Sequence, residues 1–333
     1  MLDSKKTLSS LKQYNESLYY LDWYGDVDID YLLSCDISRV LKYVRKTRKI
    51  IKNKRAYVRY KSKFGCSTFS FHNADNEHLL ARNFDYPPSP CLVVKTHPSK
   101  GFKTIGIADL NVMLFGYKKR VLSKKKNKNN LLLAPYVVMD GMNEKGLVVS
   151  VLQLTDKITK QKTGKRKIIT PLAIRAILEK CSSVEEAIKF LESHDMTSSI
   201  LSNYHFQIID KNTSVLIEYV NNKMILYREN EWPNQCLTNF YITEGANNKD
   251  TNGTDRYEII VKALKKHKTF TNEEAFDVLD KIKQNYRLKI IPLLLKCTIT
   301  TCWGAIYNTN KLTMSVVTPH NEDPIEFKID MDK

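Results

Sequence analysis

The fold of this chain is decided by the stretch Phe64-Gly65-Cys66-Ser67-Thr68 and by His78-Leu79-Leu80-Ala81-Arg82-Asn83-Phe84-Asp85, with nine residues between them. Their β-prone residues flank a polar segment at 73–76 and predict an antiparallel hairpin with strands at 66–72 and 78–85. The returning strand then brings Arg82 and Asp85 beside Cys66. Because residues three apart cannot share a face of a regular strand, this hypothesis requires a bulge or a strand end at Asn83-Phe84.

This hairpin gives the cysteine a chemical setting. An arginine near a thiol lowers the thiol pKa, and a nearby carboxylate can hold an amine in place. A cysteine at the start of a strand is, taken alone, more often a packing residue than a nucleophile. The hairpin favours the nucleophile because it brings a cation and an anion to the same residue.

The rest of the sequence predicts an α+β fold. Blocks of strands and blocks of helices follow one another, which is typical of segregated layers and not of alternating βαβ units. Before the helices, strands are expected at 91–97, 104–110, 131–138 and 146–154. Two helices are expected at 170–181 and 183–194, then strands at 204–209, 215–220 and 224–228, two helices from 254 and 271, and strands near 300–307, 312–317 and 325–329.

Charge is unevenly distributed along the 333 residues, whose formal net charge is +17. Residues 1–65 carry 15 basic and 7 acidic side chains, and the stretch 39–55 predicts a basic helix with one apolar stripe. Two further lysine-rich segments, 118–128 and 157–167, are interpreted as surface loops. The hydrophobic content of 42% excludes wholesale disorder. A protein that binds nucleic acid or an anionic surface remains an alternative, although no recognised nucleic-acid motif is visible.

Several classes are disfavoured by what the sequence contains. The first residues lack the apolar core of a secretory signal, and the longest apolar run, 131–139, is too short for a membrane span. We therefore expect a cytoplasmic protein without a membrane segment. The seven cysteines form no C-x-x-C pair and are expected to be free thiols. Cys297 and Cys302 have no histidine near them in sequence, so neither a metal site nor a cofactor is predicted.

Four segments, in this order, resemble the N-terminal-nucleophile (Ntn) cysteine hydrolases that cleave linear amides. This group includes choloylglycine hydrolases, penicillin V acylases, acid ceramidase-like amidases and isopenicillin-N acyltransferase-like enzymes. The resemblance implies a four-layer αββα sandwich preceded by a helical pro-segment. The segments are Gly65-Cys66-Ser67-Thr68, Leu80-Ala81-Arg82-Asn83-Phe84-Asp85, Asp140-Gly141-Met142-Asn143-Glu144-Lys145-Gly146-Leu147, and Leu237-Thr238-Asn239 followed by Asp255-Arg256-Tyr257.

The resemblance also implies that the chain is a precursor, because members of the group need their cysteine at a free N-terminus. Residues 1–65 are then a basic, mainly helical pro-segment removed by autocleavage between Gly65 and Cys66, and residues 66–333 are the catalytic domain. Gly65 has no Cβ to obstruct attack of the Cys66 thiol on its carbonyl. A stable N-terminal subdomain that is never cut is the alternative for residues 1–65.

By similarity, each residue of the expected site has a role. Cys66 is the nucleophile, and its α-amine is the general base. Arg82 stabilises the thiolate and Asp85 orients the α-amine. An oxyanion hole is expected from the backbone N–H of Asn143 and the side-chain amide of Asn239, and Arg256 completes the polar network. Without the resemblance, Asn143 would be interpreted as a turn residue and Arg256 as a first-turn helix charge.

The sequence thus predicts an autoprocessed cysteine amidase or acylase that hydrolyses a small-molecule N-acyl amide or N-acyl amino acid. An acyltransferase that passes the same thioester to an amine is the first alternative. The binding protein for nucleic acid or an anionic surface is the second. The resemblance is consistent with a homo-oligomer, and no dedicated nucleic-acid partner is expected.

Overall fold

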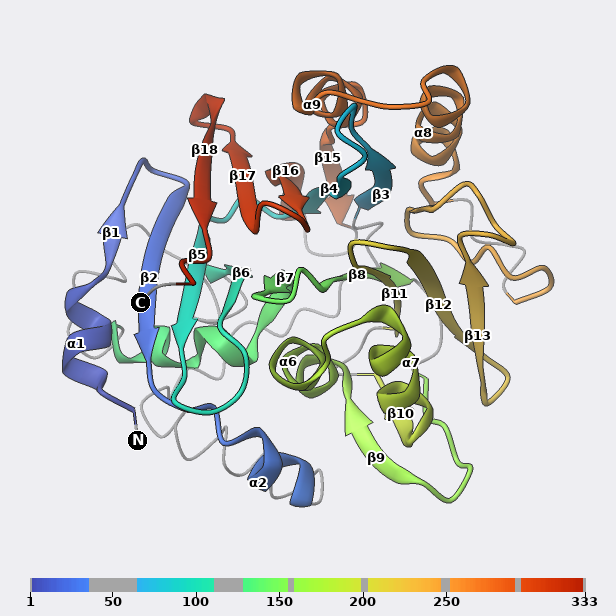
Figure 1. The fold of residues 1–333 in the computed structure, drawn as a ribbon. Helices are drawn as coiled ribbons and strands as arrows, with labels where there is room; N and C mark the ends of the chain where they lie inside the picture. The colour runs from blue at the N-terminus through green and yellow to red at the C-terminus, as the bar shows by residue number, and fades with distance from the viewer. Residues whose placement is uncertain are drawn as a thin grey trace.

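The structure, a computed structural model, describes residues 2–35, 65–110, 128–154, 159–198, 203–246, 252–290 and 295–331 (Figure 1). Its described helices are α1 (Ser4–Ser9), α2 (Ile29–Ser34), the 3-10 helix η1 (Asn129–Tyr136), α6 (Thr170–Lys180), α7 (Val184–Glu192), α8 (Thr254–Lys266) and α9 (Asn272–Lys281). None of these helices is both long and apolar enough to span a membrane.

Two large antiparallel-dominated sheets form the middle of the molecule. The nine-stranded sheet has the order β1-β2-β5-β6-β7-β8-β11-β12-β13. Its strands are β1 (Lys12–Gln13), β2 (Leu18–Tyr24), β5 (Cys91–His97), β6 (Thr104–Asp109), β7 (Val138–Asn143), β8 (Val148–Leu154), β11 (Asn203–Ile209), β12 (Ser214–Val220) and β13 (Lys223–Arg228). The second sheet has the order β14-β3-β4-β16-β17-β18, with β15 paired to β16. Its strands are β3 (Cys66–His72), β4 (His78–Tyr86), β14 (Cys236–Leu237), β15 (Asn285–Ile290), β16 (Leu295–Asn308), β17 (Thr313–Thr318) and β18 (Asn321–Lys328).

Helices cover the outer face of each sheet, as Figure 1 shows with α8 and α9 at the top and α6 and α7 at the bottom. Three groups of buried apolar side chains mark the layers. One lies between the helices α6 and α7 and the nine-stranded sheet, one between the two sheets, and one between the second sheet and α8 and α9. The expected four-layer αββα sandwich is therefore confirmed.

The sequence signals for the helix ends act as expected. Thr170 and Pro171 form the first turn of α6, where the missing N–H of proline has no helical partner to lose. The Ser183 side chain accepts a hydrogen bond from the backbone of Glu186 and begins α7. Thr271 starts α9 with a complete capping box.

One predicted strand is wrong. Residues 131–138 form most of η1 rather than a strand, and β7 begins only at Val138. Pro135 lies inside this segment and cannot donate to a strand ladder. Leu131 and Leu133 are nevertheless buried. The apolar residues of this segment therefore pack into the core without forming a strand.

The N-terminal segment contributes a strand to the core of the fold. Strand β2 pairs in parallel with β5, from Leu18 opposite Cys91 to Tyr24 opposite His97. The side chains of Leu21 and Trp23 on β2 are at most 1% exposed. The described residues 2–35 thus hold strands as well as helices, and they are built into the nine-stranded sheet. The basic helix predicted at 39–55 lies outside the described residues.

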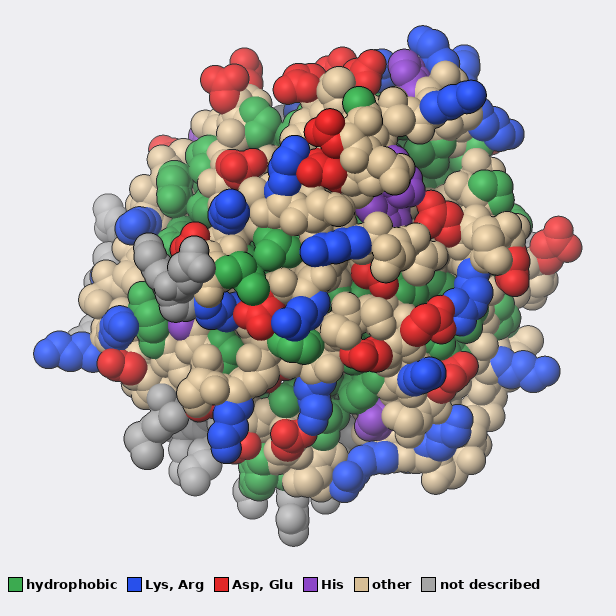
Figure 2. All heavy atoms as spheres, viewed as in Figure 1, with side chains coloured by type: hydrophobic (Ala, Val, Ile, Leu, Met, Phe, Trp, Pro, Cys, Tyr) green, Lys and Arg blue, Asp and Glu red, His purple; other side chains and the backbone are tan. Residues whose placement is uncertain are grey.

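A short two-stranded parallel sheet, formed by β9 (Arg166–Ile169) and β10 (His194–Thr197), lies beside α6 and α7 (Figure 1). The lysine-rich segment 157–167 runs into β9, and its first residues lie outside the described part, as does nearly all of 118–128. Over the face of the molecule in Figure 2, lysine and arginine side chains alternate with acidic ones. This face therefore offers no single continuous basic surface.

Candidate active site

Cys66 is the first residue of β3 and is buried, with 4% of its surface exposed. Strand β4 runs antiparallel to β3, with Cys66 opposite Phe84 and Thr68 opposite Arg82. Directly opposite residues share a face of the sheet, so the Cys66 side chain points, like that of Phe84, into the core between the two sheets. The hairpin predicted from the sequence is present in the expected register.

Arg82 lies beside the thiol and is tied to the facing sheet. Its Nη2 is 3.9 Å from the Sγ of Cys66. Its Nε is 2.9 Å from Oδ2 of Asp140 on β7, and its Nη1 donates to the hydroxyl of Ser150 on β8. The whole side chain is buried. Arg82 is therefore a fixed cation at the thiol, held by residues of a different sheet.

Asp85 approaches the cysteine from the other side. Its backbone N–H donates a 2.8 Å hydrogen bond to the carbonyl oxygen of Gly65. Its Oδ1 accepts a 2.5 Å hydrogen bond from Thr301, and its Oδ2 lies 3.8 Å from Nη1 of Arg256. A Cβ placed on Gly65 would come within 2.7 Å of Oδ2 of Asp85. The carboxylate thus packs directly against the Gly65–Cys66 peptide.

The bulge expected at Asn83-Phe84 is not required. Strand β4 pairs with β3 without a register shift, and the irregularity lies instead on β16, between Thr301 and Trp303. Arg82 and Asp85 keep strict alternation and lie on opposite faces. They both reach the cysteine because one contacts its side chain and the other contacts the peptide bond that precedes it.

Asn239 and Arg256 surround the backbone of the same residue. Oδ1 of Asn239 accepts hydrogen bonds from the Cys66 N–H at 2.6 Å and from Nη2 of Arg256 at 2.9 Å. Nη1 of Arg256 donates to the Cys66 carbonyl at 2.5 Å and to the Ser67 hydroxyl at 2.8 Å. The Nδ2 of Asn239 donates to the carbonyl of Gln153 on β8 at 2.7 Å. Both amide groups flanking the Cys66 α-carbon are thereby held by side chains.

The buried residues His205 and Glu218 hold the segment that carries Asn239. Nε2 of His205 lies 2.7 Å from the carbonyl oxygen of Thr238, and its Nδ1 lies 3.3 Å from Glu218. The carboxylate of Glu218 also accepts hydrogen bonds from the backbone N–H groups of Ile242 and Thr243. Burial raises the pKa of Glu218. The contacts with His205, Thr243 and Ile242 together lower this pKa by more, so the net shift is downward. Both ends of the turn around Asn239 are anchored to this pair.

Burial dominates the electrostatics of the uncut chain. Desolvation raises the pKa of the Cys66 thiol by more than the Arg82 guanidinium lowers it. Burial likewise raises the pKa of Asp85 to about 6, against the opposing effects of Arg256 and Thr301. The pKa of Asp140 is raised to about 6 for the same reason, against Arg82. Arg82 lowers the thiol pKa as expected, but burial of the thiol outweighs this effect.

Asn143 is not brought into this cluster. It follows Asp140 by three residues on β7, and its side chain donates to the carbonyls of Leu178 and Cys181 at α6, on the face away from Cys66. Its backbone N–H donates to the Leu147 carbonyl at 3.0 Å and closes the β7–β8 turn. The N–H expected to stabilise an oxyanion is thus used in the turn, and we do not assign Asn143 to the site.

Four residues of the site were missed by sequence reasoning. They lie on strands that face or flank the hairpin, and their contribution depends on tertiary pairing. A polar residue within an apolar strand was the only local signal for them. They are Asp140, Ser150, Gln153 and Thr301.

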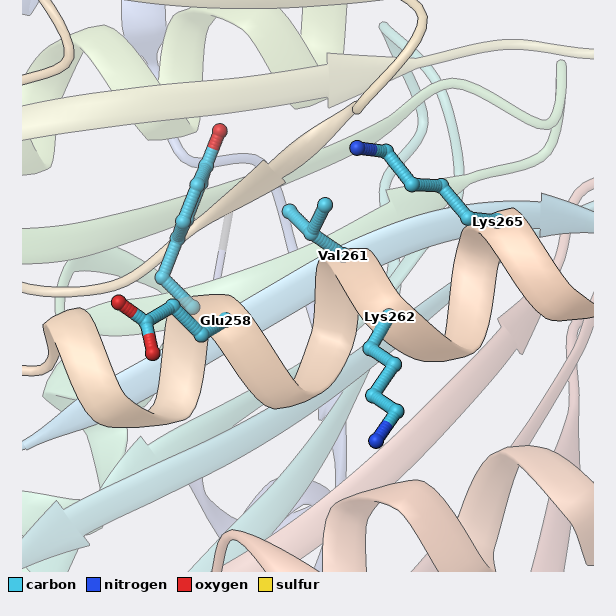
Figure 3. Close-up of a pocket in the computed structure, with 5 residues that line it drawn as sticks. Glu258, Val261, Lys262 and Lys265 are labelled. Atoms are coloured by element: carbon cyan, nitrogen blue, oxygen red, sulfur yellow. The ribbon is translucent and has the colours of Figure 1, made fainter.

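Hollows on the described surface lie away from this chemistry. A hollow of about 350 Å³ on α8 is lined by Tyr257, Glu258, Val261, Lys262 and Lys265. Figure 3 shows Glu258, Val261, Lys262 and Lys265 projecting from α8, and no residue of this hollow belongs to the cluster around Cys66. A second hollow, of about 250 Å³, lies between β2 and β18. Neither contains a residue that the sequence singled out for catalysis.

Comparison with known proteins shows the family to which the chain belongs. The family model described as acyl-coenzyme A:6-aminopenicillanic acid acyl-transferase matches residues 134–323. This range includes Asn239 and Arg256 and begins after Cys66. No curated protein sequence matches the chain.

Solved structures of the same fold extend over most of the chain. A mutant of the conjugated bile acid hydrolase from Clostridium perfringens has 15% identity and a TM-score of 0.56, covering 80% of this chain and 93% of its own. Penicillin V acylase from Agrobacterium tumefaciens has 19% identity and a TM-score of 0.53, covering 80% of this chain and 87% of its own. These likenesses confirm the Ntn-hydrolase fold.

Proposed function

This chain belongs to the acyl-coenzyme A:6-aminopenicillanic acid acyl-transferase family, and from that premise we propose that it is a self-cleaving precursor of an amide-cleaving enzyme with Cys66 as its nucleophile. One observation carries the proposal. The Gly65 carbonyl and the Cys66 thiol are both contacted by residues of strand β4, through the Asp85 N–H at 2.8 Å and Nη2 of Arg82 at 3.9 Å. These are the two groups that must react in self-cleavage.

Self-cleavage follows from this arrangement. The Cys66 thiol adds to the carbonyl carbon of Gly65, and the thiol proton passes to the Cys66 nitrogen. The C–N bond then breaks and leaves a thioester, which water hydrolyses to a Gly65 carboxylate and a free Cys66. The Asp85 N–H donates to the oxygen that becomes negative, and such a donor lowers the barrier by about 3–4 kcal/mol.

Cleavage turns the Cys66 nitrogen into an α-amine, and the same neighbours then position a catalytic group. Oδ1 of Asn239 accepts one of its hydrogens, which orients the nitrogen lone pair. With an ordinary pKa near 7.7–8.0, the amine takes the thiol proton at neutral pH and later protonates the leaving amine. One N–H of the Asn239 amide donates to Gln153, and its second hydrogen is available for the substrate oxyanion.

We take the substrate to be a small molecule with an acyl group in linear amide linkage. The fold is shared with a bile acid hydrolase and a penicillin V acylase, which supports hydrolysis. The family model is named for an acyl transfer, which supports the alternative that an amine intercepts the thioester instead of water. Product analysis with and without an acceptor amine separates the two reactions.

The N-terminal segment is proposed to stay bound after cleavage. Strand β2 is paired along its length with β5, and burying Leu21 or Trp23 stabilises the fold by about 1.5–3 kcal/mol each. The sequence predicts a segment that is removed. Because β2 pairs with β5 over seven residues and packs into the core, we propose instead a mature enzyme of two associated chains.

The decisive experiment is the intact mass and N-terminal sequence of purified protein. Wild type is expected to give two chains, the larger starting at Cys66, whereas Cys66→Ala stays at 38.6 kDa. Cys181→Ala is the matched control, because this buried thiol lies at the end of α6 and its loss leaves cleavage intact. A wild-type chain that remains uncut at neutral pH contradicts the proposal.

A further inference from the structure

Two histidines and a glutamate meet at the end of β3 opposite to Cys66. His72 ends β3 and His78 begins β4, and the two residues are paired across the hairpin. Their rings stack with centroids 4.4 Å apart and planes 4° from parallel. Glu229 comes from the other sheet, directly after β13, and one ligand atom of each residue lies within 4.8 Å of the other two. About 20 Å of strand separates this cluster from the nucleophile.

His78 is the most telling member. It is completely buried, and its Nδ1 lies 2.8 Å from the backbone carbonyl oxygen of Asp210. Since a carbonyl only accepts, Nδ1 carries the proton. The other ring nitrogen, Nε2, is buried and has no hydrogen-bond partner among the described residues. A buried polar atom without a partner costs about 1–3 kcal/mol, so this nitrogen calls for a ligand.

The surroundings of His78 match those of a metal-binding imidazole. Such histidines donate the second ring N–H to a carbonyl or carboxylate, which fixes the tautomer and aims the lone pair at the metal. Glu229 is oriented in a similar way. Its Oε2 accepts a 3.0 Å hydrogen bond from the Ser214 N–H, which leaves Oε1 as the oxygen that would bind a metal. His72 and Glu229 are only partly buried, which leaves a path for an ion.

We propose that His72, His78 and Glu229 bind one Zn²⁺ ion that links the two sheets. Two imidazoles and one carboxylate form an established zinc ligand set, with water as the fourth ligand. Tetrahedral zinc sites hold ligand atoms about 3.4 Å apart, so binding draws these side chains together by about 1.5 Å or less. Glu229 lies about 150 residues after the two histidines in the sequence, which explains why the sequence predicted no metal site.

The experiment is a calorimetric titration with Zn²⁺. The full-length protein is first freed of metal by a chelator. Wild type is expected to bind one equivalent, and Zn²⁺ to raise its melting temperature. His72→Ala and Glu229→Gln each lower the affinity by about 100-fold or more and abolish the rise in melting temperature. These two residues are partly exposed, so the variants are expected to fold where one at the buried His78 would not.

Two control variants identify the position of the ion. His194→Ala removes a histidine at the start of β10, outside the cluster, and is expected to bind Zn²⁺ like wild type. Cys66→Ala is also expected to retain binding, and Co²⁺ is expected to show no thiolate charge-transfer band. The proposal is overturned if wild type binds no stoichiometric Zn²⁺, if binding survives both His72→Ala and Glu229→Gln, or if it is lost in Cys66→Ala.

Discussion

The backbone N–H of Asp85 and the carbonyl oxygen of Gly65 are joined by a 2.8 Å hydrogen bond, one position beyond the pairing of Cys66 with Phe84. This bond extends the β3–β4 ladder by one residue and fixes the peptide that precedes the thiol. The N–H of Asp85 therefore has two roles: it continues the β-ladder, and it donates to the carbonyl that the thiol is proposed to attack. The same strand supplies the cation, Arg82, on its opposite face.

Gly65→Ala is expected to slow self-cleavage on the order of 100-fold, because a misplacement of about 1 Å at a reacting group has that effect. The new Cβ would lie 2.7 Å from Oδ2 of Asp85 and 3.3 Å from Cγ of Gln284. The rate is measured by the decay of the precursor band with time. Lys281→Ala is the control, since this lysine is exposed at the end of α9 and lies outside the cluster around Cys66. Equal rates for both variants would show that the packing of Asp85 on Gly65 is irrelevant to cleavage.

Leu21→Ala is expected to loosen the association of the two chains after cleavage. Removing a fully buried leucine from β2 destabilises by about 2–5 kcal/mol. Wild-type fragments should co-elute in native size-exclusion chromatography and separate only in denaturant, and the Leu21→Ala fragments should separate at a lower urea concentration. Lys5→Ala, at an exposed position on α1, should behave like wild type. Separation of the wild-type fragments without denaturant would refute the retained strand.

Asp85→Asn is expected to become more stable relative to the parent as pH rises. The pKa of Asp85 is raised from 3.8 to about 6, so between these values the folded chain holds a proton that the unfolded chain has lost. Stability of the parent therefore falls over this window, by about 3 kcal/mol in total, and the asparagine variant escapes the loss.

Urea unfolding at pH 4, 5, 6 and 7, in a Cys66→Ala background that blocks cleavage, measures this difference. The exposed Asp255→Asn variant is the control for a carboxylate of α8 outside the cluster. If the free energy of unfolding of the parent instead rose with pH relative to that of Asp85→Asn, the ion pair with Arg256 would outweigh the effect of burial on Asp85.

Asn239→Ala and Asn143→Ala are expected to fail in different ways. Loss of the Asn239 amide removes the contact to the Cys66 nitrogen and an oxyanion donor, and should lower kcat by about 100- to 1000-fold. Loss of Asn143 breaks the hydrogen bonds to Leu178 and Cys181 and should lower the melting temperature while kcat changes little. Steady-state kinetics and thermal unfolding of both variants make the comparison. A large fall in kcat for Asn143→Ala at unchanged stability would restore the role expected from its sequence motif.

Local sequence information was sufficient for the hairpin and not for its surroundings. The polar turn at 73–76 fixes which residue lies opposite Cys66, so the place of Arg82 could be predicted. Asn143 lies on the opposite face of β7 from Asp140, and its motif does not reveal which face meets the thiol. Parallel pairing of β2 with β5 joins segments about 70 residues apart in the sequence, beyond the reach of any periodic pattern. The cluster of Glu229 with two histidines depends in the same way on the stacking of the sheets.

The position of β2 sets an order of events for the proposed enzyme. The sheet that supplies Asp140 and Ser150 to Arg82 includes β2, so the nucleophile reaches its working geometry only in a chain that has folded with its N-terminal segment in place. Under the proposed cleavage, the cut at Gly65 acts as an internal quality check: misfolded copies keep their peptide bond and stay inactive. Synthesis of residues 66–333 alone, although it starts at the right cysteine, would bypass that check and leave β5 as an unprotected, aggregation-prone edge.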